Sequence, residues 1–248
     1  MKRLIGVVSG KGGAGKTTFV SNVGLALTIM KKSVTVVDAD METSNLGLQL
    51  GMYQFPSALQ DVLSGDIDIE DAIYIHPSGL RVLPSYLSMN YIQTYNQNRF
   101  KNTVQKLDDI VLIDSPPGIG RNVSQILKAC EEVIVVTNPE IPAVTDAMKV
   151  IKLARKLGKR NISIVINRCT DSYELLPEEI ESLCESKILG KIPEDRNVKK
   201  SVFRRTPIVG LDEYSPASLA FMKIAAELVG EEYKPPRFLR IRRLFRIA

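Results

Sequence analysis

A glycine-rich segment near the start of the chain has the residue types and spacing of a phosphate-binding loop. It follows the apolar run 4–8, a candidate buried strand, and precedes a helical pattern. Glycine backbones can turn several N–H groups toward one anion, and the helix that follows points its positive end to the same place. We therefore expect bound nucleotide phosphates to contact a segment with the sequence Gly10-Lys11-Gly12-Gly13-Ala14-Gly15-Lys16-Thr17-Thr18.

Three side chains of this loop have distinct expected roles. Lys16 would reach the β and γ phosphates, and Thr17 would offer its hydroxyl to Mg²⁺. Lys11 occupies a position that the pattern leaves free. The spacing alone therefore allows Lys11 to be an ordinary solvated cation.

Carboxylates follow two other apolar runs that we expect to be strands. Residues 34–37 lead into Asp38-Ala39-Asp40, and residues 110–113 lead into Asp114. Open α/β sheets bind ligands beyond the carboxyl ends of their strands. An acid there supplies the second Mg²⁺ contact of phosphate-loop enzymes, commonly through water. We favour this role for Asp114 over a simple turn carboxylate, and we expect Lys16, Asp40 and Asp114 to meet at one edge of the sheet.

The elements that must position these residues alternate along the chain. Further strands are expected at 79–83, 133–136, 162–166 and 188–192, and helices at 17–30, 57–63, 100–107, 142–157, 178–184 and from Ser215 onward. Ser57 is the expected N-cap of the second helix. Because the strands are almost continuously apolar, they predict a mainly parallel β-sheet flanked by helices on both faces. The expected fold class is α/β, as a single domain over residues 1–233.

The composition is that of an ordinary globular protein. The chain has 248 residues, of which 44% are hydrophobic and 25% charged. The apolar run after Met1 is too short for a signal sequence, and no run reaches the roughly 18 apolar residues of a membrane span, so we expect an intracellular protein. The spacing of Cys130, Cys169 and Cys184, with His76 as the single histidine, argues against a disulfide framework or a zinc site. Three buried thiols are expected instead.

The positive charge of the chain is concentrated in its last residues. The formal net charge is +5, and residues 237–248 contain five arginines and no acid, so that 5 − 5 leaves the preceding residues formally neutral. At about 100° per residue, most apolar side chains of this segment fall on one side of a helix. The pattern predicts a basic amphipathic tail, residues 234–248, that binds an anionic membrane. A disordered basic end and a helix packed on the protein's own core remain alternatives. The membrane-facing residues would be Phe238, Ile241, Leu244 and Phe245.

Together these residues resemble the MinD/ParA family of deviant Walker-A ATPases, over nearly the whole chain. The family signature, Lys-Gly-Gly-x-Gly-Lys-Thr-Thr, is matched by residues 11–18. The resemblance implies the P-loop NTPase fold, ATP and Mg²⁺ as cofactors, and a homodimer that sandwiches ATP. It also implies that Lys11 reaches across this homodimer to the partner's nucleotide.

The same resemblance implies roles for residues at other strand ends. Asp40 would position the attacking water, Asp38 would support the magnesium site, and Asp114 would be the Walker-B acid. The catalytic set is thus Lys11, Lys16 and Asp40, and the metal set is Thr17, Asp38 and Asp114. The adenine would be held by Asn167 and by the backbone of Pro193, Glu194 and Asp195.

Two segments look like the MinD branch of this family, namely residues 38–48 and 136–140. The Asp-Pro-Gln continuation usual in ParA proteins is absent, and no cysteines are placed to ligate an iron–sulfur cluster as in related ATPases. The chain departs from the branch at Glu42-Thr43-Ser44, where bacterial MinD proteins often have Gly-Leu-Arg, a region used to contact MinC. It also lacks the usual glycine before the late proline, in Arg205-Thr206-Pro207.

These features lead to a functional hypothesis. ATP binding would form a dimer that presents two tails, and the second tail would bind lipid at a high effective concentration. The protein would associate reversibly with the inner face of the cell membrane, resembling MinD in the placement of the division site, with an activating or effector protein as a further partner. The alternatives are a ParA-like ATPase that partitions DNA, flagella or organelles, a metabolic or metal-insertion ATPase, and a non-enzymatic nucleotide-binding scaffold.

Overall fold

The computed structural model describes residues 2–86, 99–107, 110–170, 172 and 174–235. Within them, eight strands form one sheet in the order β3-β4-β2-β5-β1-β6-β7-β8. Every neighbouring pair is parallel except β3 and β4. The strands are β1 (Arg3–Val8), β2 (Val34–Asp38), β3 (Tyr74–Ile75), β4 (Arg81–Leu83), β5 (Ile110–Asp114), β6 (Glu132–Thr137), β7 (Asn161–Cys169) and β8 (Lys187–Pro193). The predicted α/β class with a mainly parallel sheet is confirmed.

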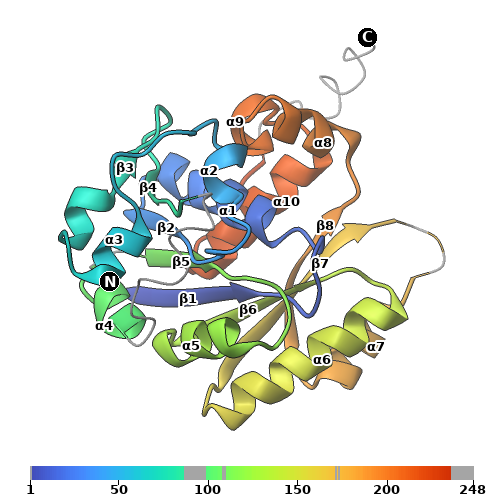
Figure 1. The fold of residues 1–248 in the computed structure, drawn as a ribbon. Coiled ribbons are helices and arrows are strands. Elements are labelled where there is room, and N and C mark those ends of the chain that lie inside the picture. Colours follow the sequence, from blue (N-terminus) through green and yellow to red (C-terminus); the bar gives the residue numbers. More distant parts are fainter. Residues whose placement is uncertain (1, 87–98, 108–109, 171, 173, 236–248) are drawn as a thin grey trace.

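Helices cover both faces of this sheet (Figure 1). One face carries α1 (Lys16–Ile29) and α10 (Pro216–Leu228), with α9 (Ile208–Leu211) packed against both. The other face carries α5 (Arg121–Ala129) and α6 (Ile141–Lys156), with α4 (Phe100–Val104) and α7 (Pro177–Cys184) packed beside them. The shorter helices are α2 (Leu46–Gln49), α3 (Leu59–Ser64), the 3₁₀ helix η1 (Ile69–Ala72) and α8 (Arg196–Phe203).

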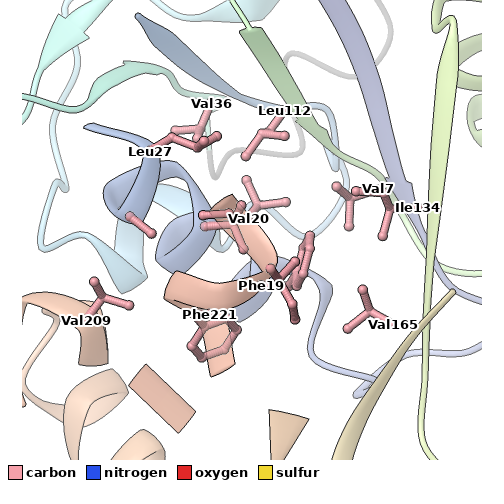
Figure 2. Close-up of a cluster of buried hydrophobic side chains, with 14 of the residues drawn as sticks. Val7, Phe19, Val20, Leu27, Val36, Leu112, Ile134, Val165, Val209 and Phe221 are labelled. Carbon is pink, nitrogen blue, oxygen red and sulfur yellow. The ribbon is translucent and has the colours of Figure 1, made fainter. Parts of the chain in front are cut away.

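The strand side chains alternate between two hydrophobic cores, as the pleat of a strand requires. In β1, Ile5 and Val7 join the core under α1, whereas Leu4 and Val8 lie on the opposite face. Figure 2 shows how α1 fills the first core: Phe19 and Val20 lie between the strand residues and Phe221 of α10. Because α1 begins directly after the glycine loop, this packing holds the loop rigidly at the end of β1.

The seven strands expected from the sequence are all present, but the short antiparallel edge strand β3 was not anticipated. The helices α2, α5, α8 and α9 and the 3₁₀ helix η1 were not anticipated either. Ser57 does not cap α3; the helix begins after Ala58, whose N–H donates to Asp61 at 2.8 Å, while the Ser57 hydroxyl bonds the Asp71 carbonyl instead. Cys130 and Cys184 are buried as expected, but Cys169 is only partly buried because it lies where β7 ends at the surface.

No helix in the described part of the chain is long and apolar enough to cross a membrane. The proposed membrane residues Phe238, Ile241, Leu244 and Phe245 lie outside the described residues, as does the rest of the tail from residue 236 onward.

Candidate functional site

The glycine loop joins the end of β1 to the start of α1. Gly15 is the N-cap of α1 with a left-handed φ of 97°, which favours glycine over any other residue. A Cβ at Gly15 would lie 2.2 Å from Nδ2 of Asn167, and one at Gly10 would lie 2.3 Å from the backbone of Asp146. A Cβ at Gly12 would meet nothing within 4 Å. Close packing therefore requires glycine at positions 10 and 15, and a positive φ of 78° favours it at position 13, whereas Gly12 faces open space.

Lys16 is the first residue of α1 and lies at the edge where β1, β2 and β5 end side by side. Its side chain is almost fully buried, and burial lowers the pKa of the ammonium group, against the opposing effects of Asp114 and Asp40. The structure thus brings together the three residues that the sequence predicted would meet. A cation held among carboxylates at a helix N-terminus is well placed to bind phosphate oxygens.

Asp114 ends β5 and is fully buried. Burial raises the pKa of its carboxyl group to about 7, even though a hydrogen bond with the Thr17 side chain and the charge of Lys16 both lower it. Its Oδ1 atom has no hydrogen-bond partner. A buried carboxylate oxygen without a partner is uncommon and calls for a ligand. Together with the Thr17 hydroxyl it offers the oxygen donors that Mg²⁺ prefers, so the residues present fit this ion.

Asp38 ends the neighbouring strand β2, and its Cα is the register partner of Asp114. Burial, followed by the charge of Asp114, raises the pKa of Asp38 to about 8. Both carboxyl oxygens of Asp38 have partners. Oδ1 accepts from the Asp40 N–H at 3.1 Å, and Oδ2 accepts from the Ser44 hydroxyl at 2.7 Å and the Leu46 N–H at 3.1 Å. In this structure Asp38 therefore anchors the loop between β2 and α2.

Asp40 belongs to that loop and has little exposed surface. Thr43 binds both of its carboxyl oxygens, through its N–H to Oδ1 at 3.1 Å and through its hydroxyl to Oδ2 at 2.9 Å. Glu42 accepts a hydrogen bond from Asn122 of α5 at 3.0 Å. Glu42, Thr43 and Ser44 thus each contribute a side-chain hydrogen bond that holds this loop.

Lys11 lies at the surface end of the glycine loop. Its ammonium group is 3.8 Å from the Glu140 carboxylate, and both side chains are well exposed. Exposed ion pairs of this length contribute little free energy. Lys11 is therefore free to leave Glu140 for a stronger partner.

The residues predicted to hold adenine lie together beside the glycine loop. One pocket is lined by Gly15, Asn167, the segment 192–195 and Phe221, among others. The Asn167 side chain donates to the Ala14 carbonyl at 2.7 Å, so it also ties β7 to the glycine loop. Arg168 beside it has a left-handed φ of 59°. The pocket agrees with the placement of the predicted set, whose contacts with adenine remain a prediction.

The sequence interpretation missed two structural roles at this edge. The Asp195 carboxylate caps α8 by accepting from Asn197 N–H at 2.8 Å, and it also accepts from the Ser215 hydroxyl at the start of α10. An Asp directly before a helix is a recognisable N-cap signal. The hydroxyl groups of Thr43 and Ser44 gave no such signal, because only the folded loop brings them to Asp40 and Asp38.

Comparison with known proteins places this arrangement in a family. Residues 5–208 match the model of the CobQ/CobB/MinD/ParA nucleotide binding domain. An uncharacterized ATP-binding protein of Methanocaldococcus jannaschii is 38% identical over 94% of this chain and 90% of its own length.

Two solved structures are similar along nearly their whole length. One is the septum site-determining protein MinD of Pyrococcus horikoshii, complexed with Mg-ADP, which is 35% identical to this chain. The match covers 92% of this chain and 96% of the Pyrococcus chain, with a TM-score of 0.87. MinD in the MinC:MinD cell division protein complex of Aquifex aeolicus has 32% identity, with 95% and 99% coverage and a TM-score of 0.85. With its glycine loop, strand-end carboxylates and sheet order, the chain belongs to the MinD/ParA family of nucleotide-binding proteins, in the MinD branch.

Proposed function

We propose that this protein is a MinD-like ATPase that binds Mg-ATP and hydrolyses it to ADP and phosphate. The observation that carries the proposal is the unpaired Oδ1 of buried Asp114, which lies beside Thr17 and Lys16 at the N-terminus of α1. This site combines a phosphate cradle, a cation and oxygen donors for a divalent ion. The Mg-ADP complex of the Pyrococcus relative supports ATP and Mg²⁺ as the ligands.

Each residue then has a role that follows from its position. The glycine loop and Lys16 bind the phosphate oxygens, Thr17 and Asp114 hold Mg²⁺, and Asp38 keeps the loop 39–46 in place. Mg²⁺ would neutralise the negative charge that develops on the phosphate oxygens. Asp40 orients the attacking water once its carboxylate exchanges the Thr43 hydroxyl for that water. The pocket at 192–195 and Asn167 hold the adenine.

The cellular part of the proposal is an ATP-dependent association with the inner face of the cell membrane. ATP would join two copies, with each Lys11 leaving Glu140 for the partner's nucleotide, and the dimer would present two amphipathic tails to anionic lipids. Hydrolysis would release them. By likeness to MinD, the protein would help to place the division site and would act with an effector protein, as MinD does with MinC in the Aquifex complex.

Turnover of ATP by the Asp40→Ala variant tests the enzymatic part. We expect this variant to bind ATP but to hydrolyse it at least about 100-fold more slowly, because water loses its orienting group. Asp68→Ala, which removes an exposed carboxylate just before η1 and away from the glycine loop, is the matched control. Unchanged turnover in Asp40→Ala would show that another group orients the water.

Liposome sedimentation tests the membrane part. We expect the protein to bind phosphatidylglycerol vesicles with ATP and to release them with ADP, and we expect removal of residues 237–248 to abolish binding. Equal binding with ADP and ATP would contradict the proposal. ATP-dependent DNA retention with a steep salt dependence would favour a ParA-like role instead, and metabolite-dependent turnover without lipid would favour a metabolic one.

A further inference from the structure

The surface of α8 combines a concentrated positive charge with an exposed aromatic ring. Residues 196–205 contain five cationic side chains and no acid, although the chain as far as residue 236 is formally neutral. All five are exposed. Phe203 is 85% exposed, more than any other large hydrophobic residue among those described. Phosphate binding and catalysis use neither Phe203 nor most of these charges.

Helix geometry gathers these residues on one face. Phe203 lies seven, four and three residues after Arg196, Lys199 and Lys200, and on an α-helix residues at these spacings share a side. Three cations therefore share the helix face that carries the ring. Val198 and Ser201 face inward, where Val198 packs against the core under α1 and Ser201 is almost fully buried. Because Val198 and Ser201 face the core, the cationic face of α8 points toward solvent.

The charges on this face are largely uncompensated. Lys199 lies 3.8 Å from Glu194, and for Arg196 and Lys200 the described residues show no ion pair. The face lies at the periphery of the fold, where α8 projects beyond α10 and β8 (Figure 1). A further exposed side chain, Val202, adds apolar surface beside the ring.

We infer that this face of α8 is a second contact with anionic lipid, separate from the C-terminal tail. Cations on such a face are attracted to lipid phosphates, and a ring held among them can enter the boundary between headgroups and acyl chains. Phosphate attraction alone would not favour an aromatic ring with most of its surface in water. The exposed ring therefore favours a lipid surface over a nucleic-acid backbone.

This inference rests on the membrane association proposed above and adds to it. The tails alone would leave the folded domain free to rotate on the membrane, whereas an additional contact on the domain itself would fix its orientation. The glycine loop and the dimer-forming Lys11 would then be held at a defined angle to the lipid surface.

Vesicle sedimentation of the full-length protein with Mg-ATP tests the inference. The variants are Phe203→Ser and the double variant Phe203→Ser with Lys200→Gln. The matched controls are Ile75→Ser, which removes an apolar side chain that is 72% exposed on β3, and Lys152→Gln, which removes an exposed cation from α6. Each protein is compared on phosphatidylglycerol vesicles, phosphatidylcholine vesicles and a DNA duplex, and its ATP turnover without lipid reports an intact fold.

We expect Phe203→Ser to weaken binding to phosphatidylglycerol vesicles by about 3- to 10-fold and the double variant by about 10-fold or more, with turnover unchanged. The controls should stay within about 2-fold of the unmodified protein. If the unmodified protein binds vesicles in an ATP-dependent way and the variants bind equally well, the role of α8 is overturned while the proposed function stands. If the unmodified protein binds no vesicles, both fail. Loss of DNA binding without loss of lipid binding would make this face a nucleic-acid surface and would overturn the inference.

Discussion

The ends of β2 and β5 carry two carboxylates that share their surroundings and differ in their partners. Asp38 and Asp114 are register partners on neighbouring strands, both are buried, and burial is the main cause of the raised pKa of each. Asp38 accepts three hydrogen bonds from its own loop. Asp114 leaves Oδ1 without any.

Asp38 is a carboxylate whose partners all come from the protein, whereas Asp114 has an oxygen that is available to a ligand. A buried acceptor without a partner costs free energy, which a protein tolerates where binding restores the interaction. On the proposed function, Asp114 at the end of β5 is the carboxylate available to the ion, whereas Asp38 at the end of β2 holds the loop that carries Asp40. Loss of Asp114 should then affect turnover first, and loss of Asp38 should affect stability first.

The largest effect is expected for Asp114→Asn. The substitution keeps the shape of the side chain and removes the negative charge that holds Mg²⁺, so turnover should fall by about 100-fold or more. Steady-state ATP hydrolysis over a range of Mg²⁺ concentrations measures this, together with urea denaturation. If the free energy of unfolding falls far enough to account for the lost turnover by itself, Asp114 is structural, like Asp38.

Asp38→Ala should act mainly through folding. It leaves the N–H groups of Asp40 and Leu46 without acceptors in a buried loop, so the free energy of unfolding should fall by about 2–4 kcal/mol. Urea denaturation gives the magnitude, and hydrogen exchange should show increased exchange in residues 40–46. If those amides stay protected, the loop is held by other contacts and the comparison fails.

The two raised pKa values predict how stability changes with pH when no nucleotide is bound. Between about pH 4 and pH 7–8 the folded protein keeps protons on Asp38 and Asp114 that the unfolded chain has lost, so stability decreases as pH rises through this window and levels off above it. Each pH unit over which one of these groups stays protonated only in the folded state should lower the free energy of unfolding by about 1.4 kcal/mol. Thermal unfolding from pH 5 to pH 9 checks the sign.

Asp114→Asn provides the control for this pH dependence. Removing one of the two titrating groups should make the slope shallower, and saturating Mg-ATP should flatten it in the unmodified protein, since the ion favours the charged carboxylate. A slope that is unchanged in Asp114→Asn would assign the titration to other groups.

Local sequence predicted the glycine loop and the strand ends well, because each depends on residues adjacent in the chain. Apolar runs of four or five residues fix β1, β2 and β5, and the parallel order of the sheet then brings Lys16, Asp40 and Asp114 to one edge. The helix α5 was missed because it follows directly on a turn rich in proline and glycine. The helix α8 was missed because its many charged residues leave few apolar positions at helical spacing.

The partners of the carboxylates were beyond local sequence. Nothing near Asp38 distinguishes it from Asp114 until the loop folds back and brings Ser44 and Leu46 to its oxygens. The partner of Asp195 was equally unpredictable, because its hydrogen bond with Ser215 joins residues twenty positions apart. Such contacts depend on tertiary packing, which spacing patterns do not contain.

The smallest effect is expected for Ser44→Ala, which tests how much of the loop anchoring comes from a side chain. The Ser44 hydroxyl lies 2.7 Å from Asp38 Oδ2 and 3.0 Å from the Ser85 carbonyl, and it is buried. Its removal should cost about 1 kcal/mol of unfolding free energy, because Oδ2 keeps the Leu46 N–H. Since this hydrogen bond lowers the pKa of Asp38, its loss should also raise that pKa further. Ser64→Ala, whose hydroxyl bonds only the backbone of its own helix, is the matched control and should cost less. An equal cost in both variants would mean that Asp38 is held by the loop backbone alone.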